Sequence, residues 1–140
     1  MMADESTAPD LVELVRVVVD AGNRRDFDVV MSYFSPDAVW EGWMGTTFTG
    51  REAIRGNLED VVGSFEELAM EPEELLELGG GVVLAVILQS VRLADSGDEW
   101  QGRVAFVSEW VNGLIVRVMI YPNIEDGRAA AERLAEERGM

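Results

Sequence analysis

The fold is decided by the stretch RVAFVSEWVNGLIVRVMIY, which runs from Arg103 to Tyr121. Two runs rich in β-branched and aromatic residues flank Asn112-Gly113. This pair suits a type I′ turn, because both central residues of that turn need a positive φ. The stretch therefore predicts a tight antiparallel hairpin.

The expected register divides the side chains of this hairpin between two faces. With Asn112 and Gly113 as the loop, Val111 faces Leu114 and counting outward pairs Glu109 with Val116. Because side chains alternate along a strand, one face then carries Arg103, Ala105, Val107, Glu109, Val116, Val118 and Ile120. The other face carries Val104, Phe106, Ser108, Trp110, Ile115, Arg117, Met119 and Tyr121.

Both faces are largely apolar, so we expect both to be covered. The face with Phe106, Trp110, Met119 and Tyr121 is too apolar to lie in water. A second copy of the same sheet is the simplest cover, which predicts a symmetric homodimer through this face.

The composition limits the chemistry that is available. The 140 residues suffice for one domain, and they include no cysteine and no histidine. Disulfides, thiol catalysis, Ser-His-Asp chemistry and His-ligated metals are thereby excluded, and we expect no cofactor.

The charge limits the partners. The 27 acidic and 11 basic residues give a formal charge of −16, which repels phosphates and anionic lipids. We therefore expect no nucleic-acid and no membrane partner. The sequence opens with no signal-like segment, and Val82 to Leu88 is too short to span a bilayer, which predicts a soluble, cytoplasmic protein.

The remaining elements follow from periodicity and punctuation. Residues 1–8 are polar and expected to be disordered, and residues 9–140 form a single domain. Thr7 is the expected cap of a first helix that ends at Gly22-Asn23. The further predictions are helices from Asp26 to Phe34 and from Arg51 to about Phe65, strands from Asp37 to Trp40, Leu68 to Leu78, Val82 to Leu93, Glu99 to Val111 and Leu114 to Tyr121, and a closing helix capped by Asn123.

This order of elements predicts an α+β fold. A strongly curved antiparallel sheet would wrap around the N-terminal helices as a cone-shaped α+β barrel. Helices close the narrow end of such a cone, and a small apolar molecule could enter its wide end.

Several segments, taken together, resemble a known family. They are "SPDAVWEG" from Ser35, "GREAIR" from Gly50, "EPEELLELGGGVV" from Glu71 and the hairpin itself. Their order and spacing resemble the SnoaL-like branch of the nuclear transport factor 2-like superfamily over residues 9 to 138. The resemblance implies a cone-shaped fold, a hydrophobic pocket for a small molecule and dimerisation through the sheet. The superfamily includes ketosteroid isomerase, limonene epoxide hydrolase and polyketide cyclases, so fold transfers better than function.

The catalytic residues implied by the resemblance are missing here. The carboxylate of ketosteroid isomerase-like enzymes would stand at Gly42, with only Glu41 beside it, and their tyrosine at Val18. The aspartate of limonene epoxide hydrolase-like enzymes would stand at Ile120, and the His and Asp pair of the cyclases has no histidine to form it.

Glu109 is the candidate general acid or base, with Arg103 beside it. The resemblance implies that the cavity side of the hairpin is the Val118 and Ile120 face, which would also point Val107, Glu109 and Arg103 inward. Desolvation in an apolar cone would raise the pKa of a carboxyl group, as a general base or acid requires. The alternative is a structural ion pair of Glu109 with Arg103 or Arg117.

Aromatic residues around the short strand are candidates for the pocket wall. Trp40, Trp43, Met44 and Phe48 provide large apolar surfaces, and their alternative role is core packing, which is favoured for Phe34. Tyr33 would either supply a phenol to the cavity or lie on the helix surface.

The acidic run Glu71, Glu73, Glu74 and Glu77 is interpreted as a solvated strand edge rather than a metal site, since alternation splits it and no histidine supports it.

Two functional hypotheses follow from these observations. The first is a domain whose apolar cavity holds a small hydrophobic ligand, with no activity assigned. The alternative is a cofactor-independent isomerase, hydratase or cyclase that uses Glu109 as general acid or base.

Overall fold

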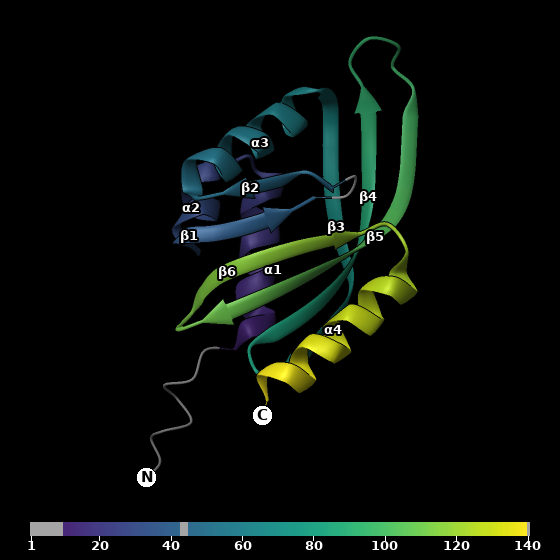
Figure 1. Cartoon of the computed structure of the whole chain (residues 1–140). Helices are drawn as coiled ribbons and strands as arrows, with labels where there is room; N and C mark the ends of the chain where they lie inside the picture. The colour runs from purple at the N-terminus through teal and green to yellow at the C-terminus, as the bar shows by residue number, and fades with distance from the viewer. Residues whose placement is uncertain (1–9, 43–44, 140) are drawn as a thin grey trace.

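The computed structural model describes residues 10–42 and 45–139. Its elements, in chain order, are α1 (Leu11–Asn23), α2 (Phe27–Ser32), β1 (Phe34–Glu41), β2 (Thr47–Thr49), α3 (Arg51–Gly63), β3 (Phe65–Gly79), β4 (Val82–Leu93), β5 (Glu99–Val111), β6 (Leu114–Tyr121) and α4 (Ile124–Arg138) (Figure 1). The expected disorder of residues 1–8 and the expected cap Thr7 lie outside the described residues.

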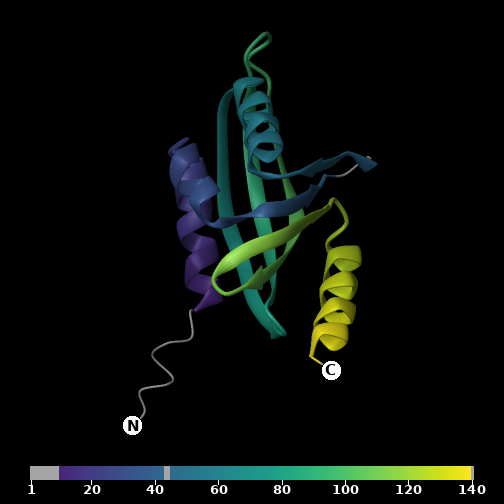
Figure 2. The same ribbon diagram turned by 60° about the vertical axis from the view of Figure 1, so that its left-hand side comes forward.

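The six strands form one curved sheet in the order β2-β1-β6-β5-β4-β3. Neighbouring strands are antiparallel except β1 and β6, which run parallel. Helix α1 lies against the concave side of the sheet and α4 against its convex side, as Figure 2 shows. The predicted α+β fold, a curved sheet around the N-terminal helices, is confirmed.

The central hairpin has the predicted turn and a different register beyond it. Asn112 and Gly113 have φ angles of 53° and 80°, and Val111 pairs with Leu114. Glu109, however, lies opposite Arg117 and not Val116, because a β-bulge interrupts the ladder between Glu109 and Trp110. One extra residue in β6 reverses which side chains of the two strands share a face. The predicted division of the two faces is therefore wrong for β5.

Two hydrophobic clusters stabilise the two sides of the sheet. The concave cluster joins the N-terminal helices to the strands and includes Val15, Ile54, Val83 and Trp110. The convex cluster lies under α4 and includes Val82, Leu84, Ala105, Val107, Met119 and Ala131. Gly127 of α4 lets this helix approach closely, because a Cβ there would lie 2.5 Å from Cβ of Ala105.

Two helices end earlier than predicted, because the residues at their predicted ends belong to strands. Asp10, Asp26 and Asn123 cap α1, α2 and α4 through their side chains. Helix α2 stops at Ser32, because the carbonyl oxygen of Tyr33 accepts a hydrogen bond from the β6 amide of Ile115 at 2.7 Å. Phe34 then begins β1, and Phe65 begins β3 instead of ending α3.

The chain itself covers the face that was predicted to pair with a second copy. Phe106 and Trp110 face the concave side, and Met119 and Tyr121 pack in the cluster under α4. The apolar face on which the homodimer prediction depended is therefore absent from the described part of the chain. The homodimer stays a prediction.

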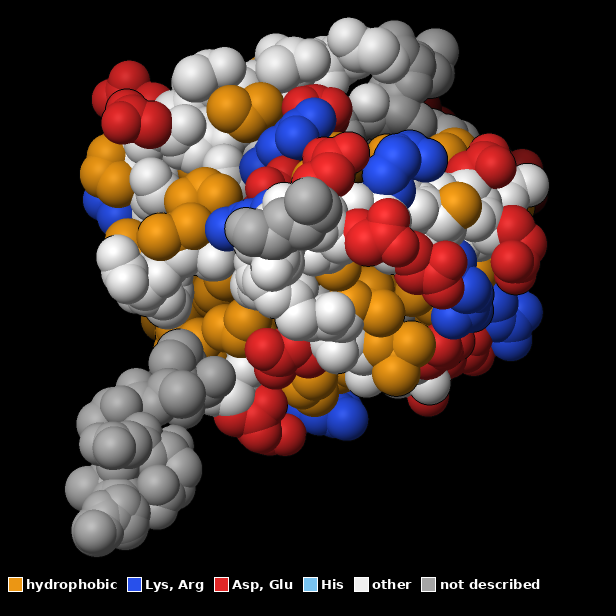
Figure 3. All heavy atoms as spheres, turned by 60° about the horizontal axis from the view of Figure 1, so that its bottom comes forward, with side chains coloured by type: hydrophobic (Ala, Val, Ile, Leu, Met, Phe, Trp, Pro, Cys, Tyr) orange, Lys and Arg blue, Asp and Glu red, His pale blue; other side chains and the backbone are white. Residues whose placement is uncertain are grey.

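Charged side chains cover much of one face of the molecule (Figure 3). Viewed from below Figure 1, acidic and arginine side chains lie next to one another, with apolar side chains between them (Figure 3). Within residues 10–42 and 45–139, no helix is both long and apolar enough to cross a membrane.

Candidate functional site

A cavity of about 620 Å³ lies between the N-terminal helices and the concave face of the sheet. We call it the inner pocket. Its helical wall includes Val15, Val18 and Val19 of α1 and Leu58, Val61 and Val62 of α3. Its sheet wall includes Trp40, Ala85, Ile87, Val104, Phe106, Ser108, Trp110, Ile115, Val118 and Ile120.

Burial distinguishes a floor from a mouth in the inner pocket. At the floor, Ser108, Trp110 and Ile115 are buried. At the mouth, Val61 and Trp100 also line the pocket but are 43% and 53% exposed. Apolar side chains of this size are costly to leave in water, so a ligand that covers them gains affinity.

An aromatic cluster forms part of the wall. The ring centroids of Phe34 and Trp40 are 6.3 Å apart, and those of Trp40 and Phe106 are 6.3 Å apart in an edge-to-face arrangement. Such packing holds the rings in fixed orientations and presents flat apolar surfaces to the cavity.

The polar groups of the lining are neutral. They are Thr46, Asn57, Gln89 and Ser108, together with the indole nitrogens of the tryptophans. No Asp, Glu, Arg, Lys or Tyr belongs to the lining formed by residues 10–42 and 45–139. The described wall of the pocket therefore offers hydrogen bonds to a ligand but no group that titrates near neutrality.

Four of the predicted ligand-binding residues line the inner pocket: Trp40, Phe48, Val118 and Ile120. Tyr33 does not; it is half-buried after α2 and packs against the concave cluster. Trp43 and Met44 lie outside the described residues. Val107 was predicted wrongly, because the bulge in the hairpin turns it toward α4, where it is fully buried.

The placement of Glu109 in the cavity was also wrong. Glu109 lies on the convex side, where it accepts hydrogen bonds from Arg117 and Arg138, each at 3.2 Å. Arg117 also donates to Glu41 at 2.8 Å, and this hydrogen bond raises the pKa of Arg117, while burial lowers it. The structural ion pair with Arg117 was the alternative interpretation, and the contacts match it.

Arg103, the second predicted catalytic residue, lies outside the inner pocket. Its guanidinium is exposed and makes an ion pair with Glu73 of β3, with 3.1 Å between Nη2 and Oε2. The predicted pairing of Arg103 with Glu109 is therefore absent, and neither side chain lines the inner pocket.

The three positions at which the resemblance implied catalytic groups face the pocket. Val18, Gly42 and Ile120 all belong to its lining. The residues there are a valine, a glycine and an isoleucine, none of which can act as an acid or a base.

The sequence interpretation missed Ser108 and Trp100. Ser108 lies on the face of β5 that was predicted to point outward, so the error in register hid it, whereas Trp100 was assigned to neither face. A Cβ on Gly102 would lie 2.5 Å from Cζ2 of Trp100, which shows that the indole lies across this glycine. The sequence signal that could have indicated this contact is Gly102, two residues after Trp100 on the same strand.

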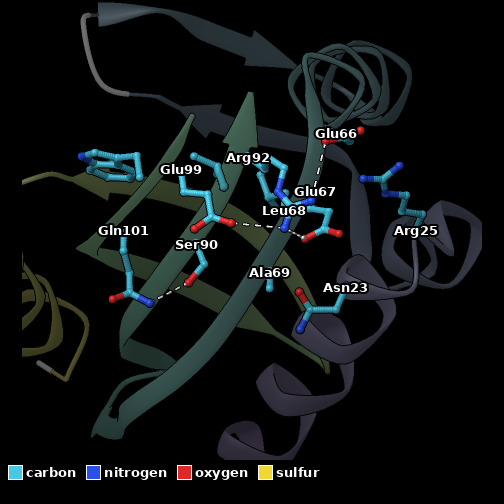
Figure 4. A pocket seen from close by; sticks show the side chains of 12 residues that line it. Asn23, Arg25, Glu66, Glu67, Leu68, Ala69, Ser90, Arg92, Glu99 and Gln101 are labelled. Atoms are coloured by element: carbon cyan, nitrogen blue, oxygen red, sulfur yellow. Dashed lines mark hydrogen bonds and ion pairs between the residues drawn. The ribbon is translucent and has the colours of Figure 1, made fainter. Parts of the chain in front are cut away.

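A second hollow, of about 600 Å³, is polar and open, and Figure 4 shows its side chains. Arg92 lies among Glu66, Glu67 and Glu99, with its nitrogens 3.1 to 3.8 Å from their carboxylate oxygens. Beside them, Gln101 donates to Ser90 Oγ at 3.0 Å. These groups satisfy one another at the surface, where ion pairs contribute little.

The acidic run of β3 divides between arginines. Glu73 pairs with Arg103, and Glu74 pairs with Arg128 of α4 at 2.8 Å. In the part of the chain that the structure describes, no three acidic side chains come together as a metal site would require.

Comparison with solved structures identifies the fold. A nuclear transport factor 2-like protein of unknown function from Burkholderia pseudomallei is similar with a TM-score of 0.75 and 19% identity, over 89% of this chain and 98% of that one. A Catenulispora acidiphila protein of ketosteroid isomerase-like fold, solved in complex with trimethylamine, is similar with a TM-score of 0.73 and 17% identity, over 85% and 92% of the two chains.

An epoxide hydrolase from Mycobacterium tuberculosis that is like limonene epoxide hydrolase is similar with a TM-score of 0.69 and 20% identity, over 87% of this chain and 89% of that one. At these identities the similarity concerns the fold alone. The search of curated proteins finds no relative of this sequence.

The family model for the SnoaL-like domain matches residues 15–118, which is most of the chain and includes nearly all of the inner pocket. The predicted resemblance is therefore confirmed, and the chain belongs to the SnoaL-like domain family.

Proposed function

We propose that this protein binds one small, uncharged and largely apolar molecule in the inner pocket. The observation that carries the proposal is the pocket itself, a cavity of about 620 Å³ whose described lining is apolar or neutral throughout. Ligand pockets are typically of this size, mostly apolar, with a few polar groups that fix orientation.

The absence of ionisable groups from the described lining favours binding over acid–base catalysis. A general base must lie within hydrogen-bond reach of the proton it removes. Glu109, the candidate base, lies on the opposite side of the sheet and is engaged by two arginines. An isomerase, hydratase or cyclase that depends on Glu109 is therefore not supported.

Two of the similar structures support a small-molecule ligand in general terms. One is named an epoxide hydrolase, and the other was solved with trimethylamine. The apolar wall of the present pocket favours a molecule without charge, because a buried charge needs a partner of opposite sign.

The proposal is tested by titration with N-phenyl-1-naphthylamine, a neutral apolar dye whose fluorescence rises in apolar surroundings. Val18→Trp fills the pocket from α1, since Val18 lines it. Val17→Trp is the matched control on the same helix, because Val17 is 40% exposed and absent from the lining.

We expect saturable binding to the wild type and to Val17→Trp, and affinity at least about tenfold weaker for Val18→Trp. No fluorescence change with the wild type, or equal affinity for all three proteins, would overturn the proposal.

A further inference from the structure

We infer that Ser108 forms a hydrogen-bond donor subsite at the floor of the inner pocket, for an uncharged acceptor oxygen of the ligand such as a ketone or ether oxygen. This inference rests on the proposed function, because it specifies the chemistry of the molecule that the pocket would hold.

The contact between Ser108 and Trp110 carries the inference. Ser108 is only 9% exposed and lines the inner pocket. Its Oγ accepts a hydrogen bond from Nε1 of Trp110 at 2.9 Å. An indole nitrogen can only donate, so the serine oxygen is the acceptor in this pair and its own hydrogen is left for another partner.

The described part of the chain provides no acceptor for that hydrogen; the only hydrogen bond of Ser108 Oγ is the one from Trp110. Leaving a buried donor unpaired is unfavourable. A ligand oxygen placed against Ser108 would remove this penalty, so the site selects for an acceptor.

The surroundings of Ser108 explain why the oxygen should be uncharged. Across the sheet it pairs with Val83 on one side and Val118 on the other, and both valines are buried. Along β5, its pocket-side neighbours are Phe106 and Trp110. The lining formed by the described residues includes no cation to neutralise a carboxylate or phosphate, whose burial would be costly.

Gln89, another neutral polar residue of the lining, lies too far away to serve the same oxygen. Gln89 pairs with Gly102, which is six residues along β5 from Ser108 and thus roughly 20 Å away. The Nε2 of Gln89 is directed toward Sδ of Met70 at 3.7 Å. Among the three buried floor residues Ser108, Trp110 and Ile115, Ser108 is therefore the one whose side chain keeps a donor for the ligand, because the indole N–H of Trp110 is already donated to Ser108.

The test compares 2-tetralone with tetralin, two bicyclic molecules that differ by a ketone oxygen, as competitors of bound N-phenyl-1-naphthylamine. In the wild type we expect the ketone to bind about three- to tenfold more tightly than the hydrocarbon. In Ser108→Ala the two affinities become equal, because tetralin keeps its affinity and 2-tetralone loses its hydrogen bond. Ser108→Thr retains the hydroxyl and the preference.

Ser90→Ala is the matched control, since Ser90 is a serine of the neighbouring strand that bonds to Gln101 and is absent from the inner pocket. We expect it to leave the preference unchanged. Should Ser108→Ala fail to fold, Ser108→Ala/Trp110→Phe removes both hydrogen-bonding partners and preserves the comparison.

The outcomes separate this inference from the proposed function. Equal affinities of the two competitors for the wild type, or a preference that survives in Ser108→Ala, would overturn the subsite and leave the apolar ligand in place. Failure of the dye and of both competitors to bind the wild type would overturn the proposed function and the subsite with it.

Discussion

Glu109 lies opposite Arg117 across the β5–β6 hairpin, and its carboxylate accepts a hydrogen bond from Arg117 at 3.2 Å. This pairing exists because Val116 is the extra residue of the bulge. The bulge places Phe106 and Ser108 of β5 on the same side of the sheet as Val118 and Ile120 of β6, and it places Glu109 on the side of α4.

The ion pairs of Glu109 predict a loss of stability without a loss of binding. Glu109→Gln keeps the size of the side chain but removes the charge that holds Arg117 and Arg138. We expect the free energy of unfolding to fall by about 2 kcal/mol, since the Glu109 side chain is only 11% exposed. Chemical denaturation measures this, and the affinity for N-phenyl-1-naphthylamine should stay within about twofold of wild type.

Glu73→Gln is the matched control, because it breaks an ion pair with the exposed Arg103. Its cost should be below about 1 kcal/mol. If Glu109→Gln had normal stability but no longer bound the dye, this account would be contradicted, and Glu109 would be a residue of the pocket.

Glu74 predicts a specific pH dependence. The hydrogen bond from Arg128 lowers the pKa of Glu74 below its ordinary value of 4.5, while burial acts in the opposite direction. Because the folded pKa is the lower one, the stabilisation is complete above pH 4.5 and is lost as the pH falls through the folded pKa. The effect is reduced by solvent, since both side chains are about one-third exposed.

We therefore expect wild type to be more stable than Glu74→Gln at neutral pH, with the difference closing below pH 4.5. Urea denaturation at several pH values measures the difference. Glu71 is an exposed position on the same strand, so the difference in stability between wild type and Glu71→Gln should not depend on pH in this way. A difference between wild type and Glu74→Gln that widens in acid would show that the sign is wrong.

Gly102 predicts the position of the Trp100 indole at the mouth of the pocket. A methyl group at Gly102 would lie 2.5 Å from Cζ2 and 2.6 Å from Cη2 of Trp100. Gly102→Ala therefore displaces the indole, and the tryptophan emission spectrum should shift while affinity for the dye changes about two- to fivefold.

The matched control is Gly56→Ala in α3, where an added Cβ meets nothing within 4 Å. It should leave the emission spectrum unchanged and stabilise the protein by up to about 1 kcal/mol. An unchanged spectrum in Gly102→Ala would place the indole elsewhere.

The sequence predicts the elements of this fold well because their signals are local. The Asn112-Gly113 turn, the bounds of β4, β5 and β6 and the Asn123 cap all follow from nearby residues. The bulge does not, because the contacts that accompany it join distant parts of the chain, namely Glu109 with Arg138 of α4 and Arg117 with Glu41 of β1.

The contrast between local signals and long-range contacts also explains which residues of the candidate site were predicted correctly. Trp40, Phe48, Val118 and Ile120 were found because aromatic content and the resemblance indicated their elements directly. Val107 and Glu109 were misplaced, and Ser108 was missed, because one inserted residue exchanges the faces of a strand. Counting outward from a turn has no means of detecting such an insertion.

The most direct test of the central claim is the measurement of intermolecular nuclear Overhauser effects between bound N-phenyl-1-naphthylamine and the methyl groups of the protein. We predict effects to Val118 and Ile120, which line the inner pocket, and none to Val107 or Leu134, which pack on the α4 side of the sheet. Effects to Val107 and Leu134 without any to Val118 and Ile120 would contradict both the register of the hairpin and the proposed ligand site.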